Sequence, residues 1–62
     1  MKKLREIREN AGLTRRQLAE FIGIKEARYG HYENGRRELP VSIAKKIGEV
    51  LEINWWELYE ET

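Results

Sequence analysis

Ten lysine and arginine side chains stand in the first 37 residues of this 62-residue chain, and they are the groups best able to bind another molecule. The same segment holds five glutamates, so its formal charge is +5. Residues 38–62 hold two lysines against six glutamates, a formal charge of −4. A polyanion would meet the first segment and be repelled by the second. The charge pattern therefore makes nucleic acid the first candidate partner.

The residue sets of an enzyme or a metal site are missing from the sequence. It has no cysteine and one histidine, His31, and it shows no phosphate-binding loop and no pair of acids suited to a cleft. We therefore expect no catalysis, no metal, no cofactor and no small-molecule ligand. No apolar run is long enough for a membrane span or a signal segment, so we expect a cytoplasmic protein without membrane contact.

The spacing of apolar residues predicts helices throughout the chain. They recur at three- and four-residue intervals, and no stretch alternates with period two over the length of a strand. Sixty-two residues hold one small core. We predict an all-α fold, a compact five-helix domain over residues 1–62. The predicted helices are residues 2–11, a segment between Thr14 and Gly23, residues 26–33, residues 41–51 and a last helix after Asn54.

Local signals indicate where these helices begin and end. Thr14 and Gln17 form a capping box, in which each side chain bonds the backbone N–H of the other residue. Gly23 closes the second helix, because glycine adopts the left-handed conformation without steric cost. Pro40 precedes the fourth helix, whose first turn tolerates proline, and Asn54 caps the last helix.

The apolar faces of the predicted helices define the expected core. Each face carries residues that share one side of a helix at 3.6 residues per turn. The expected core residues are Leu4, Ile7, Ala11, Leu18, Ala19, Phe21, Ile22, Tyr29, part of Tyr32, Ile43, Ile47, Val50, Leu51 and Leu58.

The second and third predicted helices meet the physical needs of a helix-turn-helix, with Ala19 for close crossing and Gly23 for the turn. Further residues extend the pattern: Gly12-Leu13-Thr14, Gln17-Leu18-Ala19, Gly23-Ile24, Tyr29, Glu33-Asn34-Gly35-Arg36-Arg37, Pro40, Ile47 and Leu51. On these residues the chain resembles the Cro/phage-repressor (XRE-like) type of helix-turn-helix, a lambda-repressor-like fold. The resemblance runs from about Leu4 to Leu58.

This resemblance implies a sequence-specific transcriptional regulator, most simply a repressor, that binds double-stranded DNA. Its third helix, about residues 26–33, would read the major groove. The implied base contacts are Lys25, Glu26, Ala27, Arg28 and His31. The implied phosphate contacts are Arg15, Arg36 and Arg37. The family often has glutamine at the position of Arg15, so the phosphate contact of the arginine should depend more on charge and less on geometry.

Two of the implied base contacts have an alternative interpretation. Glu26 either accepts a hydrogen bond from a base or complements the positive end of its helix, where Lys25 supplies no capping oxygen. His31 either contacts a base or is an exposed helix residue. Arg5 and Arg16 are interpreted as solvated surface residues.

Arg8 and Glu33 match positions that form an internal ion pair in the resembling family. The pair would join the first helix to the end of the third, and its role would be structural. The alternative is two unrelated surface charges.

Trp55 and Trp56 adjoin, so one helix cannot bury both against the same core. We expect one to pack on the fourth helix and the other to form an exposed aromatic patch with Tyr59. Aromatic residues are enriched at association surfaces, and the resembling family commonly binds DNA as dimers. The expected homodimer interface is Trp55, Trp56 and Tyr59. The alternative function is a protein-interaction module, such as an antitoxin-like or adaptor subunit, that uses this acidic, tryptophan-bearing end.

Overall fold

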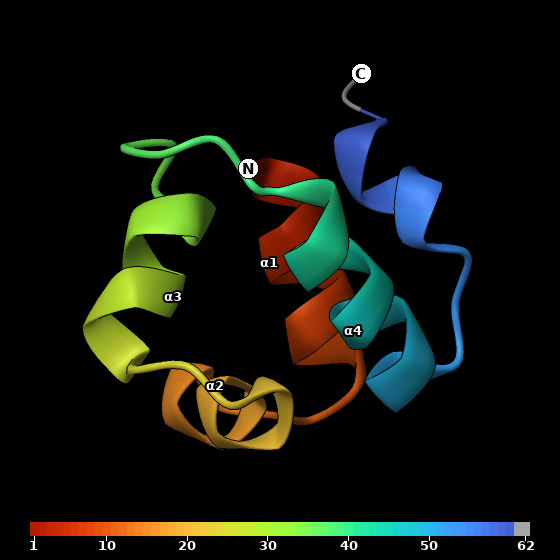
Figure 1. The fold of residues 1–62 in the computed structure, drawn as a ribbon. Helices are drawn as coiled ribbons and strands as arrows, with labels where there is room; N and C mark the ends of the chain where they lie inside the picture. The colour runs from red at the N-terminus through yellow and green to blue at the C-terminus, as the bar shows by residue number, and fades with distance from the viewer. Residues whose placement is uncertain (61–62) are drawn as a thin grey trace.

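The computed structural model describes residues 1–60, which fold as four α-helices and one 3₁₀-helix with no strand among them (Figure 1). The elements are α1 (Lys2–Asn10), α2 (Arg15–Ile22), α3 (Glu26–Glu33), α4 (Val41–Leu51) and the 3₁₀-helix η1 (Trp55–Tyr59). The predicted all-α class is confirmed over this range. No helix in it is long and apolar enough to cross a membrane.

The fifth predicted helix is a 3₁₀-helix of five residues. Asn54 is its N-cap residue, as expected, and the Asn54 N–H donates to Glu57 Oε2 at 3.2 Å. The N–H of Glu57 bonds the Asn54 carbonyl at 3.0 Å, and that of Glu60 bonds the Glu57 carbonyl at 3.1 Å. These i to i+3 bonds define 3₁₀ geometry, which suits pieces too short for a stable α-helix.

The predicted signals between α1 and α3 have the expected geometry. The Gln17 N–H donates to Thr14 Oγ1 at 3.1 Å, and the Thr14 N–H donates to Gln17 Oε1 at 2.8 Å. Gly23 is left-handed, with φ of 76°. The N–H of Ile24 then bonds the Ala19 carbonyl at 3.0 Å, which satisfies an orphan carbonyl at the end of α2. This turn sets the angle at which α3 leaves α2.

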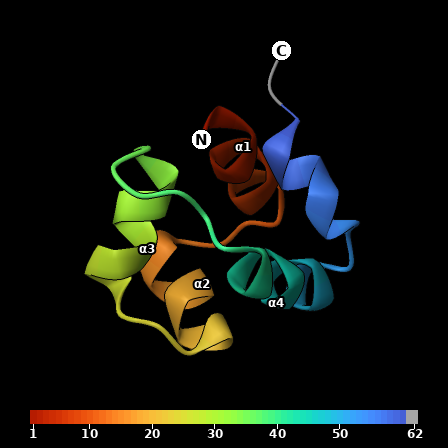
Figure 2. The ribbon, with the colours of Figure 1, turned by 45° about the horizontal axis from the view of Figure 1, so that its top comes forward.

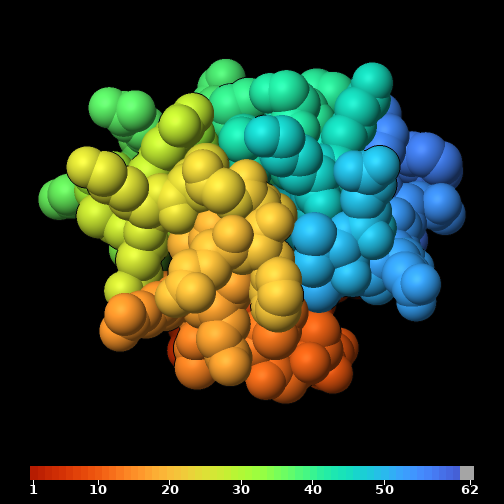
Figure 3. All heavy atoms as spheres, turned by 60° about the horizontal axis from the view of Figure 1, so that its bottom comes forward, coloured from red at the N-terminus to blue at the C-terminus, as the bar shows by residue number. Residues whose placement is uncertain are grey.

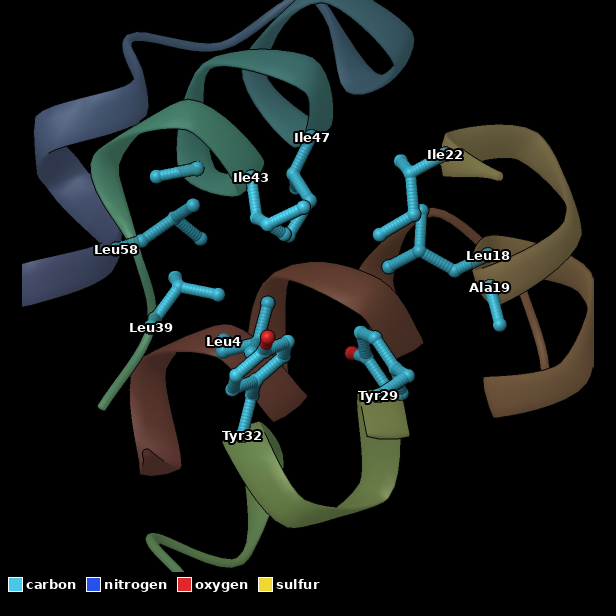
Figure 4. Close-up of a cluster of buried hydrophobic side chains, with 11 residues drawn as sticks. Leu4, Leu18, Ala19, Ile22, Tyr29, Tyr32, Leu39, Ile43, Ile47 and Leu58 are labelled. Atoms are coloured by element: carbon cyan, nitrogen blue, oxygen red, sulfur yellow. The ribbon is translucent and has the colours of Figure 1, made fainter. Parts of the chain in front are cut away.

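Every element contributes to one buried core, in which side chains from α2, α3, α4 and η1 meet those of α1 (Figure 4). Tyr29 and Tyr32 bring the two aromatic rings of α3 into it. The core residues are Leu4, Leu18, Ala19, Ile22, Tyr29, Tyr32, Leu39, Ile43, Ala44, Ile47 and Leu58. Burial of this apolar area is the main stabilising contribution to the domain.

Three expected core residues lie at the surface. Phe21 is 62% exposed, because it projects about 100° around α2 from the middle of the face formed by Leu18, Ala19 and Ile22. Val50 is exposed on α4 for the same geometric reason. Ala11 is exposed because α1 ends at Asn10 and leaves it in the cap.

α3, which belongs to the basic part of the chain, and η1, which belongs to the acidic part, lie on different sides of the molecule (Figures 1 and 2). α3 and η1 stand at opposite sides in two views, with α1 and α4 between them (Figures 1 and 2). η1 contacts α1 and α4, while α3 contacts α2 and α1. The face of α3 that is turned away from the core is therefore not covered by η1.

Candidate nucleic-acid interface

α3 has an inward face that belongs to the core and an outward face that does not. Tyr29, Tyr32 and Glu33 are buried. The predicted base contacts lie on the other side: Lys25, Glu26, Ala27 and Arg28 are exposed, and His31 is half-buried. Lys25 is the N-cap of α3 without a side-chain capping bond, as expected, while Glu26 stands in the first turn. Both interpretations of Glu26 are compatible with this position.

A shallow hollow of about 430 Å³ lies over the outward face of α3. It joins the start of α2, the outward face of α3 and the connector to α4. Its lining residues are Arg15, Glu26, Ala27, Gly30, His31, Asn34 and Arg36. The fold therefore brings together three predicted base contacts and two predicted phosphate contacts. Figure 3 shows atoms of α2 and α3 side by side on one part of the surface, with the C-terminal segment at the opposite edge.

Three predicted contact residues do not line this hollow: Lys25, Arg28 and Arg37. Arg28 is held along α3, because its Nε donates to Tyr32 Oη at 2.8 Å. Its guanidinium carbon lies 5.9 Å from the centroid of the Tyr32 ring, which is cation–π geometry. Residues at i and i+4 are neighbours on a helix, so the spacing of Arg28 and Tyr32 was a sequence signal for this contact. The contact was not predicted from the sequence.

Arg15 is held at its place by a residue from another helix. Its Nε donates to Glu33 Oε1 at 3.2 Å, across from the first residue of α2 to the last residue of α3. The Arg15 side chain remains 43% exposed. The arginine is thus fixed at one end and accessible at the rim of the hollow. No sequence pattern signals this bond, because the two residues are 18 positions apart.

Arg8 and Glu33 meet in the interior as a two-pronged ion pair. Arg8 Nε lies 2.9 Å from Glu33 Oε2, and Arg8 Nη2 lies 3.1 Å from Glu33 Oε1. The side chains are 9% and 1% exposed. Tyr29 Oη donates to Glu33 Oε2 at 2.7 Å, and Arg8 Nη1 donates to the Leu13 carbonyl at 2.7 Å. The buried carboxylate therefore has donors on both oxygens, as a buried charge requires.

The surroundings of Glu33 decide its protonation. Burial alone would raise its pKa, but the hydrogen bonds from Arg8, Tyr29 and Arg15 outweigh burial and hold the pKa of this carboxyl below its usual value. Burial, together with the bond to Glu33, raises the pKa of the Tyr29 phenol. A lowered carboxyl pKa stabilises the fold above the unfolded-state pKa of about 4.3, and this stabilisation is lost as the pH falls through the lower folded-state pKa.

Comparison with known proteins identifies this arrangement. The family model described as Helix-turn-helix matches residues 4–55. The chain is 37% identical over 58 residues to the uncharacterized HTH-type transcriptional regulator YqaF of Bacillus subtilis (strain 168). The aligned residues make up 94% of this chain and 76% of that protein. This chain belongs to the helix-turn-helix family. The resemblance to the XRE-like type is thereby confirmed. No solved structure matches the chain significantly.

The aromatic residues of η1, on the side of this helix-turn-helix domain opposite α3, are divided between the core and the surface, as expected. Trp55 packs against the core, and Lys45 Nζ lies 5.7 Å from the centroid of its ring. Trp56 is 54% exposed, and Tyr59 is exposed too, although its hydroxyl donates to the Leu39 carbonyl at 2.7 Å. The ring centroid of Trp55 lies 5.7 Å from that of Trp56 and 6.2 Å from that of Tyr59, both edge to face. We call Trp56 and Tyr59 the aromatic patch.

Replacing Arg8 with alanine should lower the free energy of unfolding by about 3–5 kcal/mol, because Glu33 would stay buried without its main partner. Urea unfolding followed by tryptophan fluorescence measures this change. Arg5→Ala is the matched control on the same helix: Arg5 forms an exposed pair with Glu9 at 3.5 Å, so its removal should change stability by less than about 0.5 kcal/mol. Equal losses in the two variants would contradict the structural role of the buried pair.

Proposed function

We propose that this protein is a sequence-specific transcriptional regulator that binds double-stranded DNA and reads the major groove with α3. Family membership supports DNA binding and transcription regulation. The observation that carries the finer proposal is the hollow, in which the outward face of α3 stands between arginines from α2 and from the connector. A helix flanked by cations can present side chains to the base edges of a groove while the cations meet a phosphate backbone at its edge. A repressor that occupies its operator and excludes polymerase is the simplest regulator of this kind.

The side chains of α3 and its flanks divide into two proposed roles. Base edges would be met by Lys25, Glu26, Ala27, Arg28 and His31. Phosphates would be met by Arg15, Arg36 and Arg37. The bond to Tyr32 engages the Nε of Arg28, which leaves its two terminal nitrogens to donate to the two acceptors of a guanine.

We further propose that the protein binds DNA as a homodimer through the aromatic patch and the adjoining edge of Trp55. An exposed tryptophan and an exposed tyrosine that both pack edge to face on one neighbouring ring are typical of an association surface. η1 lies on the side of the molecule opposite α3, so a partner bound there would leave the hollow accessible (Figure 2). Two copies would then meet two half-sites of a two-fold operator.

Replacing Arg15 or Arg36 with alanine should weaken binding to every duplex alike and reduce the slope of log affinity against log salt by about 0.9. Each change removes one proposed phosphate contact, which carries no sequence information. Fluorescence anisotropy over a salt series measures both effects. Arg16→Ala is the matched control, because Arg16 is exposed and pairs with Glu20 at 3.3 Å. Unchanged slopes in Arg15→Ala and Arg36→Ala would contradict their roles; a parent chain without salt-dependent affinity for DNA would favour the protein-interaction module.

Replacing Glu26 with glutamine should move the preferred base at one position from cytosine toward adenine. A carboxylate only accepts, so it pairs with the amino group of cytosine, whereas glutamine both donates and accepts and suits adenine. Selection from random duplex DNA at a stated salt concentration, with both proteins, reads out the change. Glu20→Gln, on the exposed surface of α2, is the control and should keep every preference. The same preferred bases in Glu26→Gln and the parent chain would show that Glu26 only complements the helix dipole.

Replacing Trp56 with glutamate should abolish a concentration-dependent dimer in sedimentation while leaving the helicity unchanged. A carboxylate within the aromatic patch would have to be desolvated when two copies associate. The variant should also lose cooperative occupancy of two half-sites about 34 Å apart. Phe21→Glu, at another exposed aromatic residue, should still dimerise. A parent chain that stays monomeric at all concentrations, with and without DNA, would contradict the dimer.

A further inference from the structure

Gly30 stands in the middle of α3, where the backbone has no need of a glycine. Among residues 1–60 the ones with positive φ are Gly12, Gly23, Gly35 and Glu52, and Gly30 is not one of them. A glycine in a helix interior weakens the helix relative to alanine, because it loses more backbone freedom on folding. The fold of α3 would therefore be more stable with alanine at this position.

Packing does not require a glycine at position 30 either. A Cβ atom built on Gly30 meets no atom of its surroundings within 4 Å in the part of the chain that the structure describes. Gly48 of α4 is the opposite case: its Cβ would lie 3.0 Å from the Ile53 carbonyl oxygen and 3.1 Å from Trp55 Cβ. Gly48 thus permits η1 to pack on α4, whereas the space in front of Gly30 is open.

The open space in front of Gly30 is the hollow over α3. Gly30 is part of its lining, with Ala27 beside it one turn earlier in α3. Arg15 and Arg36 line the same hollow from the two segments that flank α3, and Asn34 adds a side-chain amide. Arg15 is anchored through its Nε to the buried carboxylate of Glu33, so its charge stays at the rim. The hollow thus combines cationic flanks with a lining that holds the smallest possible side chain at position 30 and one carboxylate, that of Glu26, at the start of α3.

We propose that the sugar–phosphate backbone of one DNA strand lies across Gly30, seated in the hollow between Arg15 and Arg36. This inference rests on the proposed function and adds a residue that sets how closely α3 approaches the duplex. A side chain at position 30 would project into the hollow and hold the backbone away from both arginines. Because the excluded partner is backbone, the effect would be the same for all sequences.

Gly30→Ala is the variant that separates a role in binding from a role in folding. Its melting temperature should rise by about 4 °C or more, as expected when alanine replaces glycine in a helix of so small a domain. Its affinity should fall about tenfold for a selected operator and for random duplexes alike, as expected for the loss of a charge-assisted phosphate contact. Thermal unfolding by circular dichroism and anisotropy at one fixed salt concentration measure the two effects.

Gly48→Ala is the matched control, a glycine in a neighbouring helix with the opposite surroundings. Its melting temperature should fall, because the new Cβ meets backbone and a Cβ that cannot turn away. Its affinity for DNA, measured well below its melting temperature, should equal that of the parent chain. The two variants should therefore shift stability in opposite directions, and only Gly30→Ala should lose binding.

Each other outcome overturns a distinct statement. Parent-like affinity of Gly30→Ala would show that no strand lies across Gly30, and a lowered melting temperature would show that this glycine serves the fold. A loss confined to the selected operator would place a base edge, and not the backbone, against Gly30. A parent chain without affinity for duplex DNA would overturn the proposed function itself, and with it this inference.

Discussion

The structure depends on one buried carboxylate, that of Glu33. It accepts from Arg8 of α1, Tyr29 of α3 and Arg15 of α2, so a single charged group joins the three N-terminal helices. Burying such a charge is unfavourable until both oxygens have donors, and their loss would leave it unpaired in the interior. The three helices are therefore fixed relative to one another by direction-dependent bonds as well as by apolar burial.

An apolar group in place of the network could stabilise the core equally well, since buried ion pairs are often matched by hydrophobic residues of similar volume. What an apolar group cannot do is hold Arg15. Two arginines share one carboxylate, so the network keeps one positive charge in excess, and the exposed partner is Arg15 at the rim of the hollow. The buried pair thus orders a surface cation before any ligand arrives, which reduces the side-chain entropy lost on binding.

The sequence predicted the features that depend on neighbours along the chain. The capping box at Thr14, the left-handed Gly23 and the start of α4 after Pro40 are local, and the structure has them where they were expected. The burial of Phe21 was predicted wrongly, because apolar character alone does not say which side of a short helix faces the core. The bond from Arg15 to Glu33 could not be predicted, since it exists only once α2 and α3 have taken their crossing angle.

The pattern along α3 separates what the fold needs from what a ligand would read. Tyr29, Tyr32 and Glu33 are buried and fixed by the core and the ion network, so a change there acts on stability. Residues 25–28 face outward and make no contribution to the core. Substitutions at these outward positions should therefore leave the scaffold the same and, under the proposed function, alter the preferred DNA sequence. Gly30 resembles these outward residues, because the space in front of it is open. Its presence nevertheless lowers the stability of α3 relative to alanine.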